Sequence, residues 1–204
     1  PLTAKGSMAG IFRGLWGRAS WLCLAVAACG GARSPSGNDK APAAQTRTIP
    51  LSEAIVLETS GPPPSDTTVT FTAGEPQVII IRHGPPEYIV FAELAFPAAA
   101  FAERGREVRV EVRPRPGVYG LDLTTSLAIR DSATIAFKYA RYFAAPSRAR
   151  AVYGSDIAYE RALAVGRLRR PEAVLATLPS SRPYPDVLLA PLPAAGTYLV
   201  ASPQ

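Results

Sequence analysis

The side chains that could carry out chemistry in this sequence are few and widely separated. His83 is the only histidine, and it lies in Arg82-His83-Gly84-Pro85-Pro86 at the end of an apolar run. A metal site built on histidine needs further ligands at fixed spacing, and a hydrolase needs a serine and an acid beside the histidine. Neither pattern can be read here, so we interpret His83 as a structural residue at a strand end.

Other motifs of catalytic or ligand-binding proteins are also missing from the sequence. Tyr153-Gly154-Ser155-Asp156 does not fit the G-x-S-x-G pattern of a nucleophile elbow, and we interpret it as a turn. The aspartates are scattered singly, and the only Gly-Gly pair is Gly30-Gly31, so neither a calcium loop nor a phosphate-binding loop is indicated. We therefore predict a protein that is not an enzyme and that binds no metal and no cofactor.

The thiol of Cys29 offers a different chemistry, the attachment of lipid. Arg13 and Arg18 precede an uncharged, mostly apolar segment from residue 19 to 28, which is the order typical of a secretory signal. Only 14 uncharged residues separate Arg18 from Arg33, whereas a membrane-spanning helix needs roughly twenty apolar residues. The segment is therefore better suited to a cleaved signal than to a membrane span.

The sequence Leu24-Ala25-Val26-Ala27-Ala28-Cys29 resembles the lipobox of bacterial lipoproteins, in which an aliphatic residue and two small residues precede the modified cysteine. The resemblance implies that Cys29 receives a diacylglyceryl group, that the signal is cut between Ala28 and Cys29, and that a fatty acid such as palmitate acylates the new amino terminus. Two or three acyl chains anchor a domain on a membrane, where one chain binds only marginally. Ordinary secretion with cleavage at the small residues, and an uncleaved anchor, remain alternatives.

This interpretation divides the chain into four segments. Met8 is the only methionine, so we treat 1–7 as upstream residues, 8–28 as the signal peptide, 29–48 as the lipidated cysteine with a flexible tether, and 49–204 as one domain. The tether has no large apolar side chains with which to offset the entropy of ordering. The resemblance implies export and a lipid-mediated membrane contact in the cell envelope, and Gly30 in place of Asp after the cysteine favours the outer membrane or a periplasm-facing position.

The charge balance argues against nucleic acid as a partner. The net charge is +6, but Lys5, Arg13 and Arg18 precede Cys29, which leaves 19 basic and 16 acidic residues, or +3, after cleavage. The densest basic patch, 161–170, is flanked by Glu160 and Glu172. We therefore predict no binding to nucleic acid.

The segment 49–204 has the pattern of an all-β domain. In Glu107–Arg113 charged residues alternate with valines, so one face should meet water and the other a core. With strands at spacings near a dozen residues, the default architecture is an antiparallel β-sandwich. Pro171–Leu178 fits either a short helix or a strand. The predicted strands are Thr67–Thr72, Gln77–Arg82, Tyr88–Phe96, Glu107–Arg113, Ala133–Ala140, Ala158–Val165, Val187–Ala190 and Gly196–Ala201.

Part of this segment resembles the ZU5 domain, an Ig-like β-sandwich. The turn in Leu94-Ala95-Phe96-Pro97-Ala98-Ala99-Ala100-Phe101 is similar to that family's turn, although Ala99 stands where glycine is common, and Val110 to Pro116 matches its V-x-V-x-x-x-P pattern. Ala133–Tyr139 is similar to the family's next strand and Leu189–Ala201 to its closing hairpin. The resemblance implies a domain that contacts proteins. It implies no self-cleavage, because the Phe-Ser bond that some relatives cut is absent.

The tyrosines suggest an alternative function. Tyr139, Tyr142 and Tyr153 could lie on one surface and bind a glycan or a small molecule, although tyrosines that pack in the core with the hydroxyl at its rim are the simpler interpretation. The sequence as a whole favours a non-catalytic envelope lipoprotein that presents a protein-interaction or structural domain to a protein partner. A ligand-binding module is the alternative.

Overall fold

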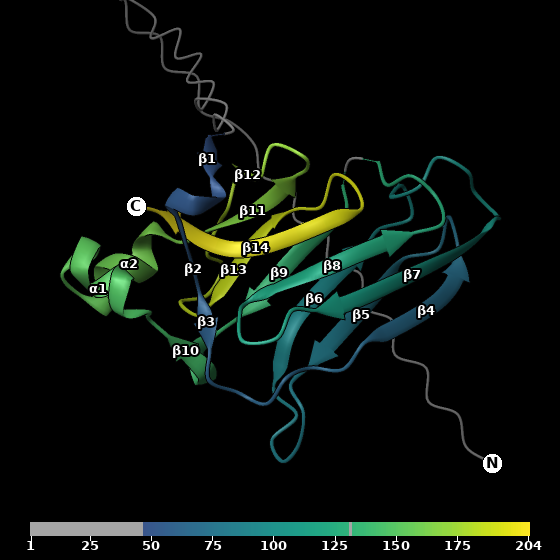
Figure 1. The fold of residues 1–204 in the computed structure, drawn as a ribbon. Helices are drawn as coiled ribbons and strands as arrows, with labels where there is room; N and C mark the ends of the chain where they lie inside the picture. Colours follow the sequence, from purple (N-terminus) through teal and green to yellow (C-terminus); the bar gives the residue numbers. More distant parts are fainter. Residues whose placement is uncertain (1–46, 131) are drawn as a thin grey trace, which may run out of the picture. The chain divides into compact units, whose positions relative to one another are not determined.

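The computed structural model describes residues 47–130 and 132–204, which fold as an antiparallel β-sandwich (Figure 1). The large sheet has the strand order β1-β12-β11-β14-β8-β7-β4, with β2 paired to part of β14. The small sheet has the order β13-β9-β6-β5, and β3 and β10 form a separate pair. The predicted all-β sandwich is thereby confirmed. Cys29, Ala28 and nearly all of the predicted tether lie outside the described residues.

The strands are short, and most pair with strands distant in the sequence. The large sheet contains β1 (Thr48–Pro50), β2 (Ala54–Val56), β4 (Thr67–Thr72), β7 (Glu107–Pro114), β8 (Gly120–Thr125), β11 (Ala164–Arg169), β12 (Val174–Thr177) and β14 (Gly196–Pro203). The small sheet contains β5 (Gln77–Arg82), β6 (Val90–Phe96), β9 (Thr134–Lys138) and β13 (Val187–Pro191). The remaining elements are β3 (Glu58–Thr59), β10 (Phe143–Ala144), two 3-10 turns (Leu51–Glu53 and Ala140–Tyr142), α1 (Ser147–Tyr153) and α2 (Asp156–Ala162).

The core lies between the inner faces of the two sheets, and β7 shows how the sequence specifies it. Val108, Val110 and Val112 are fully buried, while the charged residues between them point outward, as the alternation predicts. Burying an aliphatic side chain of this size stabilises the fold by about 1.5–3 kcal/mol before conformational entropy is counted. The period-two pattern therefore fixes which face of the strand packs inward.

The predicted strand Ala158–Val165 is wrong, because α2 occupies most of that range. The Ser155 hydroxyl accepts a hydrogen bond from the Ala158 N–H at 3.2 Å and so caps the helix, which offsets the weak helical periodicity of its sequence. Gly154 adopts the left-handed conformation, with φ of 72°, and ends α1, so the predicted turn at 153–156 is confirmed. No helix in the described parts of the chain is long and apolar enough to cross a membrane.

The closing hairpin predicted for Leu189–Ala201 is also wrong. β13 pairs with β9 in the small sheet, whereas β14 pairs with β11 and β8 in the large sheet. Pro191 and Pro193 lack the N–H groups that a hairpin ladder would use, and the Leu192 N–H donates to the carbonyl of Ala133 at 2.8 Å. The chain therefore crosses from one sheet to the other at this point. The ambiguous segment Pro171–Leu178 contains a strand, β12.

Candidate interaction face

His83 directly follows β5 and is buried in the core, where its ring packs against other aromatic rings. Its Nδ1 lies 2.7 Å from the carbonyl oxygen of Pro62, and its Nε2 has no hydrogen-bond partner among the described residues. Phe91 and Tyr142 approach the ring edge-on, with centroids 5.2 and 4.7 Å away. The ring nitrogens therefore lack the adjoining serine and acid that a hydrolase of the Ser-His-Asp type uses.

The alternative of a tyrosine surface is wrong at its first residue, where the favoured interpretation of core packing holds. Tyr139 is buried, with its hydroxyl 3.1 Å from Glu160 Oε1 and 3.2 Å from the carbonyl oxygen of Pro185, while Tyr142 and Tyr153 are only partly exposed. The rings instead belong to an internal row with neighbouring centroids 4.7–6.3 Å apart. The row is Tyr142, His83, Tyr119, Tyr139, Phe143, Tyr159 and Tyr153. The middle of the row is buried in the core, and only Tyr142, Phe143 and Tyr153 are partly exposed, so the three tyrosines do not form one open aromatic surface.

Burial of this row has an electrostatic consequence. Loss of hydration raises the pKa of Tyr119 to about 12, and burial also raises the pKa values of Tyr139 and Tyr159. The phenols of Tyr119, Tyr139 and Tyr159 therefore stay neutral over the whole physiological range. No group of three or more histidine, cysteine, aspartate or glutamate side chains that could hold a metal ion occurs in the described parts of the chain.

The outer end of the row is held by a small charged cluster in the loop between β5 and β6. The Tyr142 hydroxyl donates to Glu87 Oε2 at 2.7 Å, and Arg141 pairs with the same carboxylate at 2.8 Å. These hydrogen bonds, that of Arg141 first, lower the pKa of Glu87 from 4.5 to about 2. The cluster joins the loop after β5 to the turn after β9.

The outer face of the small sheet is mostly apolar. Val78 is 54% exposed and Ile80 is 45% exposed, although both lie in regular strand structure. The strand register carries this character across the sheet, interrupted by the Lys138–Glu93 ion pair. We call this surface the apolar face, and its apolar members are Val78, Ile80, Ala95, Leu189, Pro191 and Ala136, of which Ala136 is only 9% exposed; Thr134 lies between Ala95 and Pro191 in the register.

The outer face of β4 and β7 in the large sheet is polar. Thr68, Thr70 and Thr72 are exposed and lie opposite Glu111, Arg109 and Glu107 in the antiparallel register. Arg109 and Arg113 each form an ion pair with Glu111. We call this surface the polar face, and it is the ordinary solvated outside of an antiparallel sheet.

The two edges of the small sheet also differ. At β13, Ser181 and Leu189 exchange two backbone hydrogen bonds of 2.8 and 2.9 Å, and the Leu178 N–H donates to Val165 of β11. This segment closes the β13 edge and ties it to the large sheet. At the other edge, β5 pairs with β6 alone among the described residues. An open strand edge beside exposed apolar side chains is a template for another strand.

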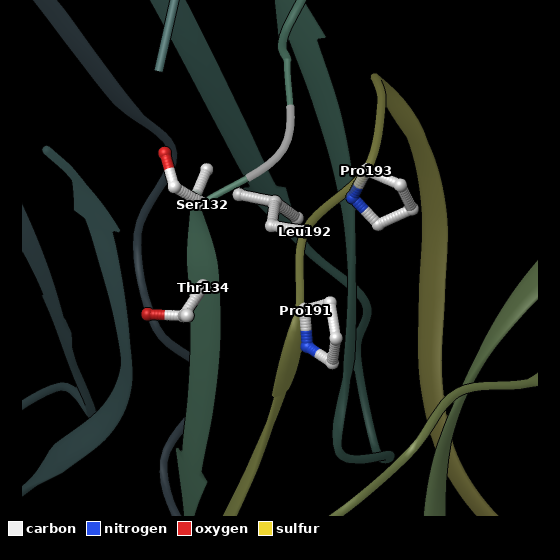
Figure 2. A pocket seen from close by; sticks show the side chains of 6 residues that line it. Ser132, Thr134, Pro191, Leu192 and Pro193 are labelled. Atoms are coloured by element: carbon white, nitrogen blue, oxygen red, sulfur yellow. The ribbon is translucent and has the colours of Figure 1, made fainter. Parts of the chain in front are cut away.

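A shallow hollow of about 360 Å³ lies at the end of the apolar face, where β9 begins and β13 ends. Figure 2 shows Leu192, Pro191 and Pro193 beside it, while the hydroxyls of Ser132 and Thr134 point away from these three side chains. Small-molecule sites usually aim a few polar groups into an apolar pocket. The labelled side chains show no such arrangement, so the hollow extends the apolar face rather than forming a separate ligand pocket.

The apolar face was not foreseen from the sequence. Gln77–Arg82 contains four consecutive aliphatic residues, a run that is typical of strands buried on both faces. In the structure no layer of the described residues covers the outer face of this strand, so its second and fourth residues are exposed. The only usable signal in the sequence was the lack of alternation in this strand, compared with the strict alternation in β7.

Searches against models of protein families, against curated proteins and against solved structures found no match for this chain.

Proposed function

We propose that this chain is a non-catalytic lipoprotein of the cell envelope whose β-sandwich contacts another protein through the apolar face. The observation that carries the proposal is the exposure of Val78 and Ile80 on a regular strand beside an open sheet edge. Exposed contiguous apolar surface on a soluble domain commonly marks an interaction site. The polar face of the same sandwich has the same alternation but exposes polar side chains, so it serves as the control surface for this comparison.

The lipid anchor is the second part of the proposal. It rests on the lipobox-like sequence before Cys29, with cleavage between Ala28 and Cys29, and it places the domain at a membrane. Mass spectrometry of the amino-terminal peptide tests it directly. We expect the peptide to start at Cys29 with diacylglyceryl and fatty acyl groups, and the Cys29→Ala variant to lose both the lipid and the cleavage. An unmodified Cys29 in membrane-bound protein would contradict the anchor.

The contact function is tested by crosslinking the full-length lipidated protein in its own membrane, capturing it, and identifying what is attached. Ile80→Lys places a charge on the apolar face, and Thr70→Lys places the same charge on the polar face. We expect the attached protein to be lost in Ile80→Lys and kept in Thr70→Lys. Equal recovery of the attached protein from both variants would contradict the assignment of the contact to the apolar face.

A further inference from the structure

We propose that the partner is a second copy of this chain, and that the two copies join at the open edge of the apolar face through antiparallel pairing of β5 with β5, so that Val78 and Ile80 of each copy lie side by side. The two small sheets, of four strands each, would then form one continuous sheet across a two-fold axis. This inference rests on the proposed function, since it names the partner of the same surface.

The backbone of β5 is oriented for this pairing. The His83 N–H donates to the carbonyl of Ile89 at 2.8 Å, so His83 directs its N–H toward the β6 side. Alternate residues of an antiparallel strand point to the same side, and the extra residue of the β-bulge is Phe91 on β6, which leaves the alternation along β5 intact. The backbone groups of Val78 and Ile80 therefore face the open edge.

A side-chain contact supports this orientation. The amide of Gln77 donates from Nε2 to the carbonyl of Val78 at 3.1 Å. This contact agrees with a Val78 carbonyl that faces the open edge rather than β6. In the proposed dimer the added strand takes the place of this contact and of solvent along the edge.

The sequence of β5 is self-complementary about Ile79. With the two-fold axis at that residue, Val78 lies opposite Ile80 of the second copy, and Ile79 lies opposite its own equivalent. These are β-branched cross-strand pairs, the kind that stabilises sheets. A register shifted by two residues would set Val78 against Arg82 of the second copy in one direction and Ile80 against Pro76 in the other, so the match of β-branched residues selects one register.

Charge supports the same register. Arg82 comes opposite Pro76 of the second copy, one residue from Glu75. Glu75 and Arg82 are both exposed, and neither takes part in an ion pair within the described parts of the chain. The two-fold axis repeats the contact, which gives two Arg82–Glu75 pairs at the ends of the shared ladder.

The contact is small, and the anchor compensates for its size. Pairing two strands of six residues buries less than the roughly 1,200–2,000 Å² of a stable interface, so the dimer should be weak in solution. Two copies anchored on one membrane meet at a far higher effective concentration than two dissolved copies. The pairing should therefore be prominent only for the lipidated protein.

The test places the photo-crosslinking residue p-benzoylphenylalanine at Val78 of the full-length chain, expressed in bacteria and irradiated in the membrane. The matched control carries the same residue at Thr70 on the polar face. We expect an adduct of twice the chain mass from position 78, and at least tenfold less from position 70. Arg82→Glu should reduce the yield severalfold, and adding Glu75→Arg should restore it, because the double reversal re-forms both ion pairs.

The outcomes separate this inference from the proposed function. An adduct at position 78 with a different protein overturns the second copy but leaves the contact function standing. No adduct at position 78 in folded protein overturns both. If Arg82→Glu lowers the dimer yield and the added Glu75→Arg does not restore it, the register about Ile79 is overturned. A dimer formed equally well by Cys29→Ala supports the β5 pairing and contradicts the part assigned to the anchor.

Discussion

β4 and β5 are consecutive edge strands of six residues each, joined by the link 73–76, yet their outer faces carry opposite kinds of side chain. β4 presents threonines that continue into the charged rows of β7, while β5 presents Val78 and Ile80, which continue into the rest of the apolar face. Both strands bury their inner side chains against the same core. The core therefore explains only half of the apolar residues in β5.

The difference shows that core packing requires Ile79 and Ile81 to be apolar but does not require it of Val78 and Ile80. Natural sheets commonly protect an open edge with charges, prolines or bulges. β5 has such features only at its ends, where Pro76 precedes it and Arg82 is its last residue, and the bulge near Arg82 adds its extra residue to β6 on the paired side. The centre of the strand is left open, which is the arrangement expected where another strand is to be added.

The largest expected effect is on the free energy of unfolding, and it compares the inner and outer side chains of β5. Ile81 is 1% exposed, so Ile81→Ala should lower the free energy of unfolding by about 2–5 kcal/mol, because it removes buried carbon and leaves a cavity. Ile80→Ala on the apolar face should cost less than about 1 kcal/mol. Urea denaturation of both variants measures the two values. Similar losses would mean that Ile80 is packed within the same molecule.

The next largest effect comes from exchanging the edges. Thr70→Ile gives β4 an aliphatic outer residue, and Ile80→Thr gives β5 the chemistry of β4. Ile80→Thr removes about 1 kcal/mol of apolar burial from the β5–β5 contact, so association should weaken about fivefold, whereas Thr70→Ile lies outside that contact and should leave association unchanged. Sedimentation of the full-length protein in detergent measures this. A change in the same direction for both would break the comparison.

A smaller effect distinguishes the ion pairs of the two faces. Lys138 and Glu93 are 34% and 32% exposed, whereas Arg109 on the polar face is 62% exposed beside Glu111. Double-mutant cycles to alanine should give about 0.5–1 kcal/mol for Lys138–Glu93 and about 0–0.5 kcal/mol for Arg109–Glu111. The second value should also fall more steeply with salt, and the reverse order would show that exposure does not govern these pairs.

The smallest effect concerns pH and the loop that follows β5. Because Arg141 and Tyr142 lower the pKa of Glu87 to about 2, the stability that this carboxylate contributes is present above about pH 4.5 and is lost as the pH falls toward 2. Wild type should therefore exceed Glu87→Gln in stability at pH 6, and the difference should vanish near pH 2. Denaturation curves at both pH values test this, and Glu103→Gln, on an exposed loop pair, is the control.

Sequence reasoning succeeded where local pattern decides the structure. The alternation in Glu107–Arg113 predicted β7 and its buried valines correctly. It failed where distant pairing decides: β2, β3 and β10 are two or three residues long and exist because of their partners. Core packing of tyrosines was the favoured interpretation, but the order of the row was not predicted, because Tyr119 lies just before β8 and Tyr139 just after β9 and the two meet only in the folded core. The open edge of β5 could not be predicted from local pattern either, because it depends on which other strands of the chain pair with β5.

The position of β14 bears on when the chain can fold. It lies within the large sheet, where it pairs with β11, β8 and β2, and residues 197–202 are all buried. It is also the last strand in chain order, so the ribosome must make nearly all of the domain before the sheet can close around it. Early segments such as β2, whose Ile55 pairs with Ser202, wait for a partner made almost 150 residues later. If the proposed export takes place, this late pairing would delay closure of the large sheet until the chain is nearly complete, and a chain that has not yet closed its sheet is the form that translocation requires.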